Sequence, residues 1–77
     1  MSQNELLQSV INYLDTQKNT YGKKKVYRTA IYAVMEDRHS VNGYFDGRSI
    51  GHYLLSQAAA EFGGEYVTDK GRAHVKF

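Results

Sequence analysis

Basic side chains are the residues of this chain with the most evident chemistry, and that chemistry is binding to a polyanion. The run Lys23-Lys24-Lys25 is a dense group of positive charge, and Arg48 opens a helical pattern later in the chain. Lys70, Arg72 and Lys76 follow near the end. Such side chains bind phosphates by displacing the counterions around them. A surface that gathers these residues would bind nucleic acid, although a lysine run in a loop is also typical of a solvated segment.

The overall charge does not decide whether such a surface exists. Ten Lys and Arg residues oppose eight Asp and Glu residues, which gives a formal net charge of +2 and a pI near 8.9. Strong nucleic-acid-binding domains usually carry a larger excess of positive charge. The distribution of the basic residues over the fold therefore matters more than their number.

Catalytic and metal chemistry find little support in the residue pattern. His39, His52 and His74 fall in three different segments, with no carboxylate at the spacing of a metal ligand. Glu36 and Asp37 are neighbours at the end of a helical pattern, where a pair of acids needs no catalytic role. Neither a phosphate-binding glycine loop nor a nucleophile motif is present. We therefore expect no enzymatic activity, no metal and no cofactor.

Length and composition predict one small domain that covers residues 1–77. The chain lacks Cys, so its stability must come from side-chain packing without disulfides or thiolate-bound zinc. A hydrophobic content of 42% is typical of a folded globular protein. Apolar runs are only a few residues long and no signal peptide is evident, so we expect no membrane association. The absence of Cys also fits a cytoplasmic location.

Two amphipathic helices are expected in the first half of the chain. Ser2 stands three residues before Glu5, which is the spacing of a capping box at a helix start. The apolar stripe of this helix contains Leu6, Leu7, Val10, Ile11 and Leu14. A second helix is expected after the lysine run, up to about residue 38, and its stripe contains Val26, Tyr27, Ala30, Ile31 and Val34. Its outer face is expected to carry Arg28, Tyr32 and Glu36.

A third helix is expected over residues 48–62, and its outer face is unusual. Ile50, Leu54, Leu55, Ala58 and Phe62 are expected to face the interior. The outer face would then carry Ser49, His52, Tyr53, Ser56, Ala59 and Ala60, with Gln57 at its edge. Because none of these side chains is long and charged, another surface can approach closely. That surface is a nucleic acid in one interpretation, and a second copy of the chain or a partner protein in the other.

The chain ends in an expected β-hairpin. Gly63-Gly64 stops the third helix, and residues 65–68 and 72–77 alternate as two strands around Asp69-Lys70-Gly71. A three-residue loop of this kind places Thr68 opposite Arg72 and Tyr66 opposite His74. In that register the core side carries Val67, Ala73, Val75 and Phe77. The outward side carries Tyr66, Thr68, Arg72, His74 and Lys76.

The order of these elements resembles the winged helix–turn–helix superfamily. Residues 47–54 look like the start of a recognition helix, and residues 63–67 and 71–77 resemble the wing. The resemblance is one of fold and covers most of the chain. It implies that the third helix lies in the major groove of DNA, while the hairpin contacts the backbone or the minor groove.

The resemblance also implies which residues bind the nucleic acid. Tyr53, Ser56 and Gln57 become candidate contacts to bases or phosphates, because Gln can pair with adenine and hydroxyl groups mostly hold phosphates. The remaining candidates on the third helix are Ser49 and His52. Phosphate contacts would come from Arg48, Lys70, Arg72 and Lys76, extended by Lys23, Lys24 and Lys25.

These observations favour an α+β fold, a three-helix bundle with a C-terminal β-hairpin and a winged-helix-like arrangement. The expected function is that of a small double-stranded-DNA-binding protein of the transcription-regulator type, as found in bacteria and phages, with a homodimer as one form. The alternative is a small protein-binding module or inhibitor that blocks the surface of a partner protein. Its contact residues would be Tyr13, Tyr21, Tyr32, Tyr44, Tyr53 and Tyr66, since Tyr is enriched at interfaces.

Overall fold

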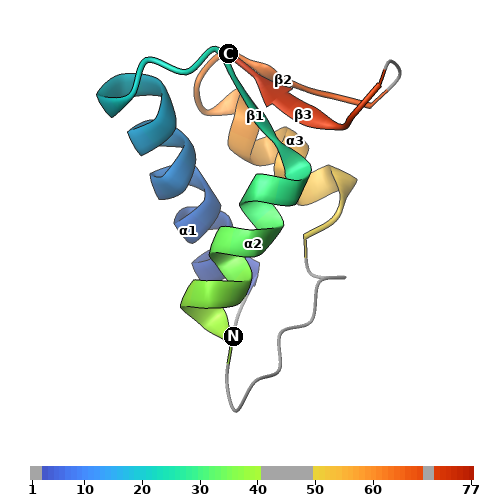
Figure 1. Ribbon diagram of the computed structural model, residues 1–77. Coiled ribbons are helices and arrows are strands. Elements are labelled where there is room, and N and C mark those ends of the chain that lie inside the picture. Colours follow the sequence, from blue (N-terminus) through green and yellow to red (C-terminus); the bar gives the residue numbers. More distant parts are fainter. Residues whose placement is uncertain (1–2, 41–49, 69–70) are drawn as a thin grey trace.

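A computed structural model describes residues 3–40, 50–68 and 71–77 of the chain, and within them it has an α+β fold (Figure 1). The helices are α1 (Gln3–Asp15), α2 (Arg28–His39) and α3 (His52–Ala60), and α1 runs into a π-helical turn, η1 (Thr16–Thr20). The strands are β1 (Lys25–Tyr27), β2 (Glu65–Val67) and β3 (His74–Lys76). The three expected helices and the hairpin are therefore confirmed, and a third strand is added to them.

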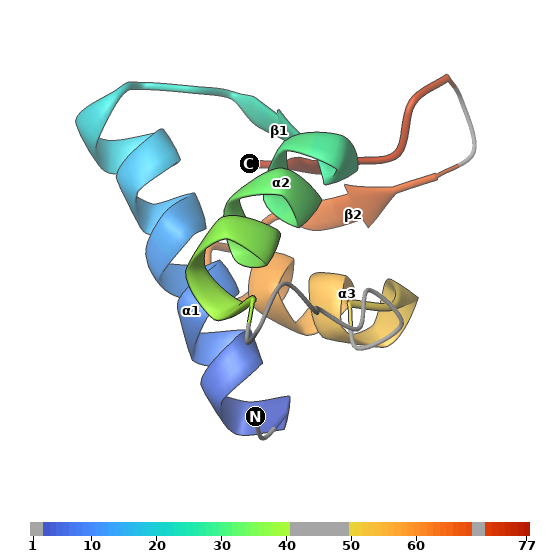
Figure 2. The same ribbon diagram turned by 60° about the horizontal axis from the view of Figure 1, so that its bottom comes forward.

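The three strands form one antiparallel sheet in the order β1-β3-β2. Val75 of β3 lies opposite Val26 of β1 on one side and opposite Tyr66 of β2 on the other. Val26 and Val75 are buried, and Tyr66 packs against the core. This face of the sheet therefore covers the helices, and the hairpin of β2 and β3 projects beyond them (Figures 1 and 2).

The expected start of the second helix was wrong, because Val26 and Tyr27 belong to β1. A β-branched residue followed by an aromatic residue suits a strand as well as a helix. Pairing with β3, which is distant in the sequence, decides in favour of the strand, because Val26 lies opposite Val75. Helix α2 then begins at Arg28, whose backbone N–H donates to the carbonyl oxygen of Ala73 at 2.9 Å.

The expected hairpin register was also wrong, by one residue. Tyr66 lies opposite Val75 rather than opposite His74, and Val67 lies opposite His74. A shift of one residue exchanges the two faces of a strand. Tyr66 therefore faces the core instead of the outside, and Val67 lies on the outer face instead of in the core. Gly71 has a φ of 70°, a left-handed conformation that glycine adopts without steric cost.

The core joins all three helices to the sheet. Its fully buried large side chains are Leu6, Leu14, Ile31, Met35, Ile50, Leu55, Val10 and Val75. Each contributes about 1.5–3 kcal/mol through the hydrophobic effect. Most of the expected apolar stripes are confirmed, with three corrections. Met35 is in the core although it was not expected there, Ala59 is buried rather than on the outer face of α3, and Tyr32 is half-buried rather than on the outer face of α2.

Two contacts fix α3 in its position. At its start, the Tyr32 hydroxyl group donates a hydrogen bond of 2.9 Å to the carbonyl oxygen of Ile50. At its end, Gly63 has a φ of 68° and its N–H donates to the carbonyl oxygen of Ala60. The adjacent Gly64 passes so close to the backbone of Lys76 that a Cβ atom would collide with the Lys76 carbonyl oxygen. The expected stop at Gly63-Gly64 is confirmed, and the second glycine also allows the chain to pass the sheet.

Candidate nucleic-acid-binding surface

The outer face of the sheet carries a group of basic and aromatic side chains from both ends of the chain. Lys25 of β1 lies directly opposite Lys76 of β3, and Tyr27 lies directly opposite His74. These four alternate with the buried Val26 and Val75, so their side chains point away from the helices. Together with Arg72, which contacts Tyr27, they form what we term the cationic sheet face: Lys25, Tyr27, Arg72, His74 and Lys76.

The Tyr27 ring organises the cationic sheet face. The guanidinium carbon of Arg72 lies 4.2 Å from the centre of this ring, and the Lys25 ammonium nitrogen lies 5.2 Å from it. The His74 ring meets it edge to face at 5.9 Å between centres. Both cations are within the range of a cation–π interaction. Tyr27 was not expected as a site residue, although its position two residues after Lys25 fits one face of a strand.

Arg72 is further fixed by hydrogen bonds. Its Nη2 group donates to the Thr29 hydroxyl oxygen at 3.0 Å, and its carbonyl oxygen lies 2.8 Å from Nδ1 of His74. Thr29 belongs to the first turn of α2, so Arg72 joins the hairpin to that helix. A guanidinium group held on an aromatic ring keeps its remaining N–H groups available in a fixed orientation. Planar groups of this kind are suited to bidentate contact with a phosphate.

The cross-strand charges on this face are unequal in number. Lys25 and Lys76 are like charges directly opposite each other on neighbouring strands, which is destabilising in a sheet. Glu65 lies opposite Lys76 on the far strand, and this pair of opposite charges offsets the repulsion. Within the described strands Glu65 is the single acidic residue. The face therefore carries a net positive charge.

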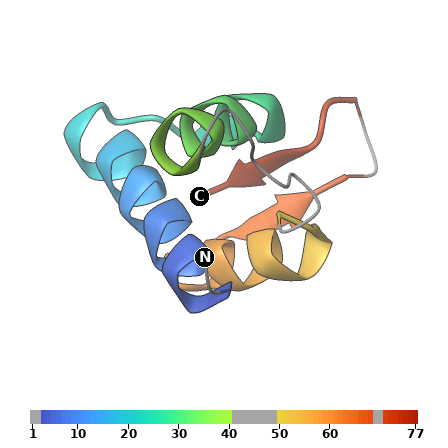
Figure 3. The ribbon, with the colours of Figure 1, turned by 90° about the horizontal axis from the view of Figure 1, so that it is seen from below.

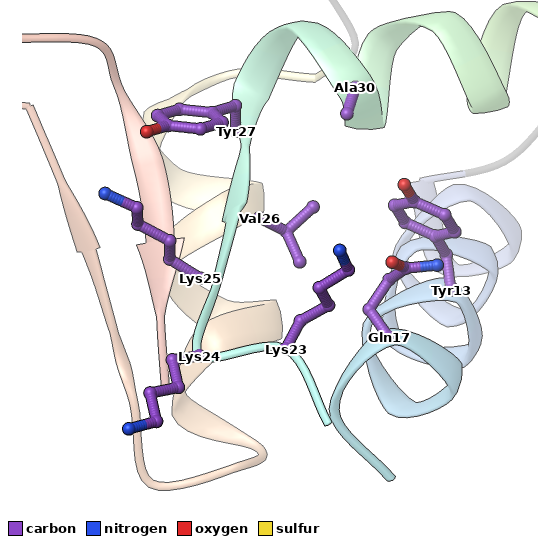
Figure 4. Close-up of a pocket in the computed structure, with 8 residues that line it drawn as sticks. All are labelled: Tyr13, Gln17, Lys23, Lys24, Lys25, Val26, Tyr27 and Ala30. Carbon is purple, nitrogen blue, oxygen red and sulfur yellow. The ribbon is translucent and has the colours of Figure 1, made fainter. Parts of the chain in front are cut away.

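The lysine run does not form one patch. Figure 4 shows that the side chain of Lys25 points toward Tyr27, that of Lys23 points into a hollow beside Tyr13 and Gln17, and that of Lys24 points away from both. The carbonyl oxygen of Lys24 accepts a 3.0 Å hydrogen bond from the N–H of Phe77. Of the three lysines, Lys25 is the one that lies on the cationic sheet face.

The expected binding residues of α3 lie on another side of the molecule. His52, Tyr53 and Gln57 are exposed and Ser56 is half-buried. The His52 ring contacts Tyr66 on the helix-facing side of the sheet, with 5.3 Å between the ring centres. The basic side chains of β1 and β3 point the opposite way. The structure thus brings Lys25, Arg72 and Lys76 together, and separates them from the exposed side of α3, while Arg48, Ser49 and Lys70 lie outside the described residues.

Comparison with known proteins assigns no family to the chain. No family model matches it, and neither the curated proteins nor the solved structures give a significant match. Among the described residues, no three His, Cys, Asp or Glu side chains are placed to hold a metal ion. The described helices also include none with the length and apolar character needed to cross a bilayer. The function must therefore be inferred from the surface chemistry of this chain.

Proposed function

We propose that the protein binds double-stranded DNA as a small regulator of winged-helix-like architecture, with the cationic sheet face as its phosphate-binding surface. The observation that carries the proposal is a cluster of cations from the two halves of the chain. Lys25 and Arg72 lie over the Tyr27 ring, and Lys76 lies directly opposite Lys25 in the sheet. Sequence-independent affinity for DNA comes mainly from such phosphate contacts.

The shape of the molecule supports a duplex as the target. The hairpin projects beyond the helices, and α3 lies on one of its sides (Figures 2 and 3). The basic side chains lie on the other side, because they alternate with the buried Val26 and Val75. β-Ribbons are among the elements that bind DNA by lying in one of its grooves. In this arrangement Arg72 and Lys76 contact one backbone, and Tyr53 and Gln57 of α3 approach the adjacent groove.

The absence of acidic residues from α3 supports the same arrangement. Its sequence from His52 to Ala60 contains neither Asp nor Glu. Its exposed side chains are therefore not repelled by phosphates. Gln57, which is exposed, is a side chain suited to pairing with an adenine edge.

The test is a fluorescence anisotropy titration of a labelled 20-base-pair duplex over a range of salt concentrations. Three phosphate contacts predict a slope of about −3 in a plot of log K against log salt concentration, at about −0.9 per contact. The double variant Arg72→Glu plus Lys76→Glu is expected to lower affinity roughly tenfold or more at low salt, on every sequence, and to reduce the slope.

The matched control is Lys18→Glu plus Arg38→Glu, which changes the net charge equally but away from the cationic sheet face. Lys18 lies over the Phe62 ring and Arg38 over the Tyr13 ring. A clear difference between the two double variants supports the proposed surface, whereas equal losses indicate attraction by net charge alone. Absence of binding at about 10 μM protein and low salt contradicts DNA binding altogether, because non-specific DNA-binding domains associate under such conditions.

A protein-binding function is the second candidate, and the exposure of two tyrosines favours it. Tyr53 is 76% exposed and Tyr21 is 64% exposed, and they are the exposed large hydrophobic side chains of the described residues. Tyr is frequent at the energetic centre of protein interfaces. If the protein binds a second copy of itself through α3, Tyr53→Ser converts a dimer into a monomer in light-scattering chromatography. Replacement of Arg72 and Lys76 then has little effect on that assembly.

A further inference from the structure

A hollow of about 500 Å³ lies between the end of α1, strand β1 and the start of α2 (Figure 4). Its apolar lining includes Val26 and Ala30, together with the side chains of Tyr13 and Tyr27. Three polar groups stand at its rim, namely the ammonium group of Lys23, the amide group of Gln17 and the hydroxyl group of Tyr13. The hollow is open to solvent, and its volume is within the range of small-molecule sites.

The π-helical turn η1 places two of these polar groups. Residues 16–20 form wider turns than an α-helix does, and Gln17 in this turn lies at the rim of the hollow. The carbonyl oxygen of Gln17 accepts a 2.9 Å hydrogen bond from the backbone N–H of Lys23. This bond returns the chain to the hollow and holds Lys23 beside Gln17. π-Helical segments are rare, and they occur frequently at functional sites.

The electrostatics of the hollow favour an anion. Its lining residues include three lysines and no acid. Lys23 directs its ammonium group toward the hollow, whereas Lys24 and Lys25 point elsewhere (Figure 4). Burial raises the pKa of the Tyr13 hydroxyl group, and the positive charge of Arg38 offsets part of this effect. Tyr13 therefore stays protonated at neutral pH, so that its hydroxyl group is a hydrogen-bond donor.

We propose that this hollow binds a small organic carboxylate with a flat apolar body. The carboxylate accepts hydrogen bonds from the Lys23 ammonium, Gln17 amide and Tyr13 hydroxyl groups, and the apolar body packs against Val26 and Ala30. One ammonium group matches the single charge of a carboxylate. Bonds of this type to a charged acceptor are stronger than those between neutral groups. The hollow shares Lys25 and Tyr27 with the cationic sheet face, but carboxylate binding in it does not require that the protein binds DNA.

The experiment is an NMR titration of the ¹⁵N-labelled full chain with benzoate, with benzamide as the uncharged probe of the same shape. We expect saturable shifts with benzoate for the amides of Tyr13, Gln17, Lys23, Val26 and Ala30. Benzamide is expected to bind about tenfold or more weakly, because it lacks the charge that Lys23 recognises. Absence of saturable shifts up to about 20 mM benzoate, the weak limit for a probe of this size, overturns the proposal.

Paired lysine variants test the placement of the site. Lys23→Met is expected to weaken benzoate binding about tenfold, since it removes the ammonium group and keeps a side chain of similar length. Lys18→Met makes the same change on a lysine outside the hollow, whose ammonium group lies over the Phe62 ring, and is expected to leave binding unchanged. Neither lysine is buried, so both variants should fold. Equal effects of the two variants, or equal affinities for benzoate and benzamide, overturn the proposal.

Discussion

The guanidinium group of Arg72 lies 4.2 Å from the centre of the Tyr27 ring and thereby joins the end of the hairpin to the edge strand β1. The same guanidinium group donates to Thr29 at the start of α2. Cation–π contacts at partly exposed sites contribute about 0.5–1 kcal/mol. The contact therefore stabilises the fold modestly, and it orients one of the three cations of the proposed phosphate-binding surface.

Replacement of Tyr27 should show how much of the DNA affinity depends on the orientation of Arg72 and Lys25, and how much on their charge. In Tyr27→Leu all three cations remain, but Arg72 and Lys25 lose the ring on which they lie. We expect a loss of about 0.5–1 kcal/mol in urea unfolding. DNA affinity should fall by no more than about fivefold, with an unchanged salt slope, because the number of phosphate contacts is unchanged. Tyr21→Leu is the control, since Tyr21 is 64% exposed. A reduced salt slope in Tyr27→Leu would show that Tyr27 holds a cation at its phosphate.

Ala59 and Ala60 are neighbouring positions that together test which side of α3 is buried. Ala59 is fully buried, whereas its neighbour Ala60 is exposed. Ala59→Lys places an ammonium group in a packed interior, and we expect it to cost several kcal/mol or to prevent folding. Ala60→Lys should change the free energy of unfolding by no more than about 0.5 kcal/mol. Circular dichroism with urea titration measures both. Similar values for the two variants would contradict the packing of α3 against α1.

For this chain the sequence predicts helices and turns better than it predicts which strands pair and in which register. The stripe of Leu6, Val10 and Leu14 is confirmed because its periodicity is set within one helix. The glycine conformations at Gly63 and Gly71 are likewise local properties of a turn. Strand β1 and the hairpin register depend instead on contacts between distant residues, which short alternating patterns do not specify.

In the candidate site, too, features set within one segment could be predicted, whereas those set by strand pairing could not. The basic side chains Arg72 and Lys76 were expected to point outward, and they do. Their grouping with Lys25 could not be foreseen, because it requires the pairing of β1 with β3. The expected union of these residues with the exposed side of α3 was based on both groups facing outward, which does not specify how the sheet packs on the helices. His52 of α3 contacts Tyr66 on the core side of the sheet, whereas the basic side chains lie on its other side.

Gly64 is expected to tolerate no side chain. A Cβ atom at this position collides with the Lys76 carbonyl oxygen, which is part of the backbone and cannot turn aside as a side chain would. Gly64→Ala should therefore destabilise the protein by about 1–3 kcal/mol, as overpacking of a close contact does. Urea unfolding measures this change. A loss below about 0.5 kcal/mol would contradict the close approach of Gly64 to β3.

We expect ionisation of the Tyr13 hydroxyl group to destabilise the folded protein at alkaline pH. Burial raises the pKa of its hydroxyl group above the usual 10.0, with partial opposition from Arg38. A raised pKa means that the native state favours the neutral phenol, so the associated stability is complete below about pH 10 and is lost as the pH rises through the native pKa. Tyr13→Phe has no such group to ionise.

The difference in unfolding free energy between the natural chain and Tyr13→Phe should therefore be constant up to about pH 9.5. Above that pH the natural chain should lose stability relative to the variant, with a slope of at most about 1.4 kcal/mol per pH unit. Urea titrations between pH 8 and pH 11.5 measure this difference, and the lysines cancel because both chains contain them. A difference that stays flat to pH 11.5 would show that Tyr13 ionises as readily in the folded protein as in the unfolded one. A difference that rises in favour of the natural chain would show that Tyr13 ionises more readily in the folded protein.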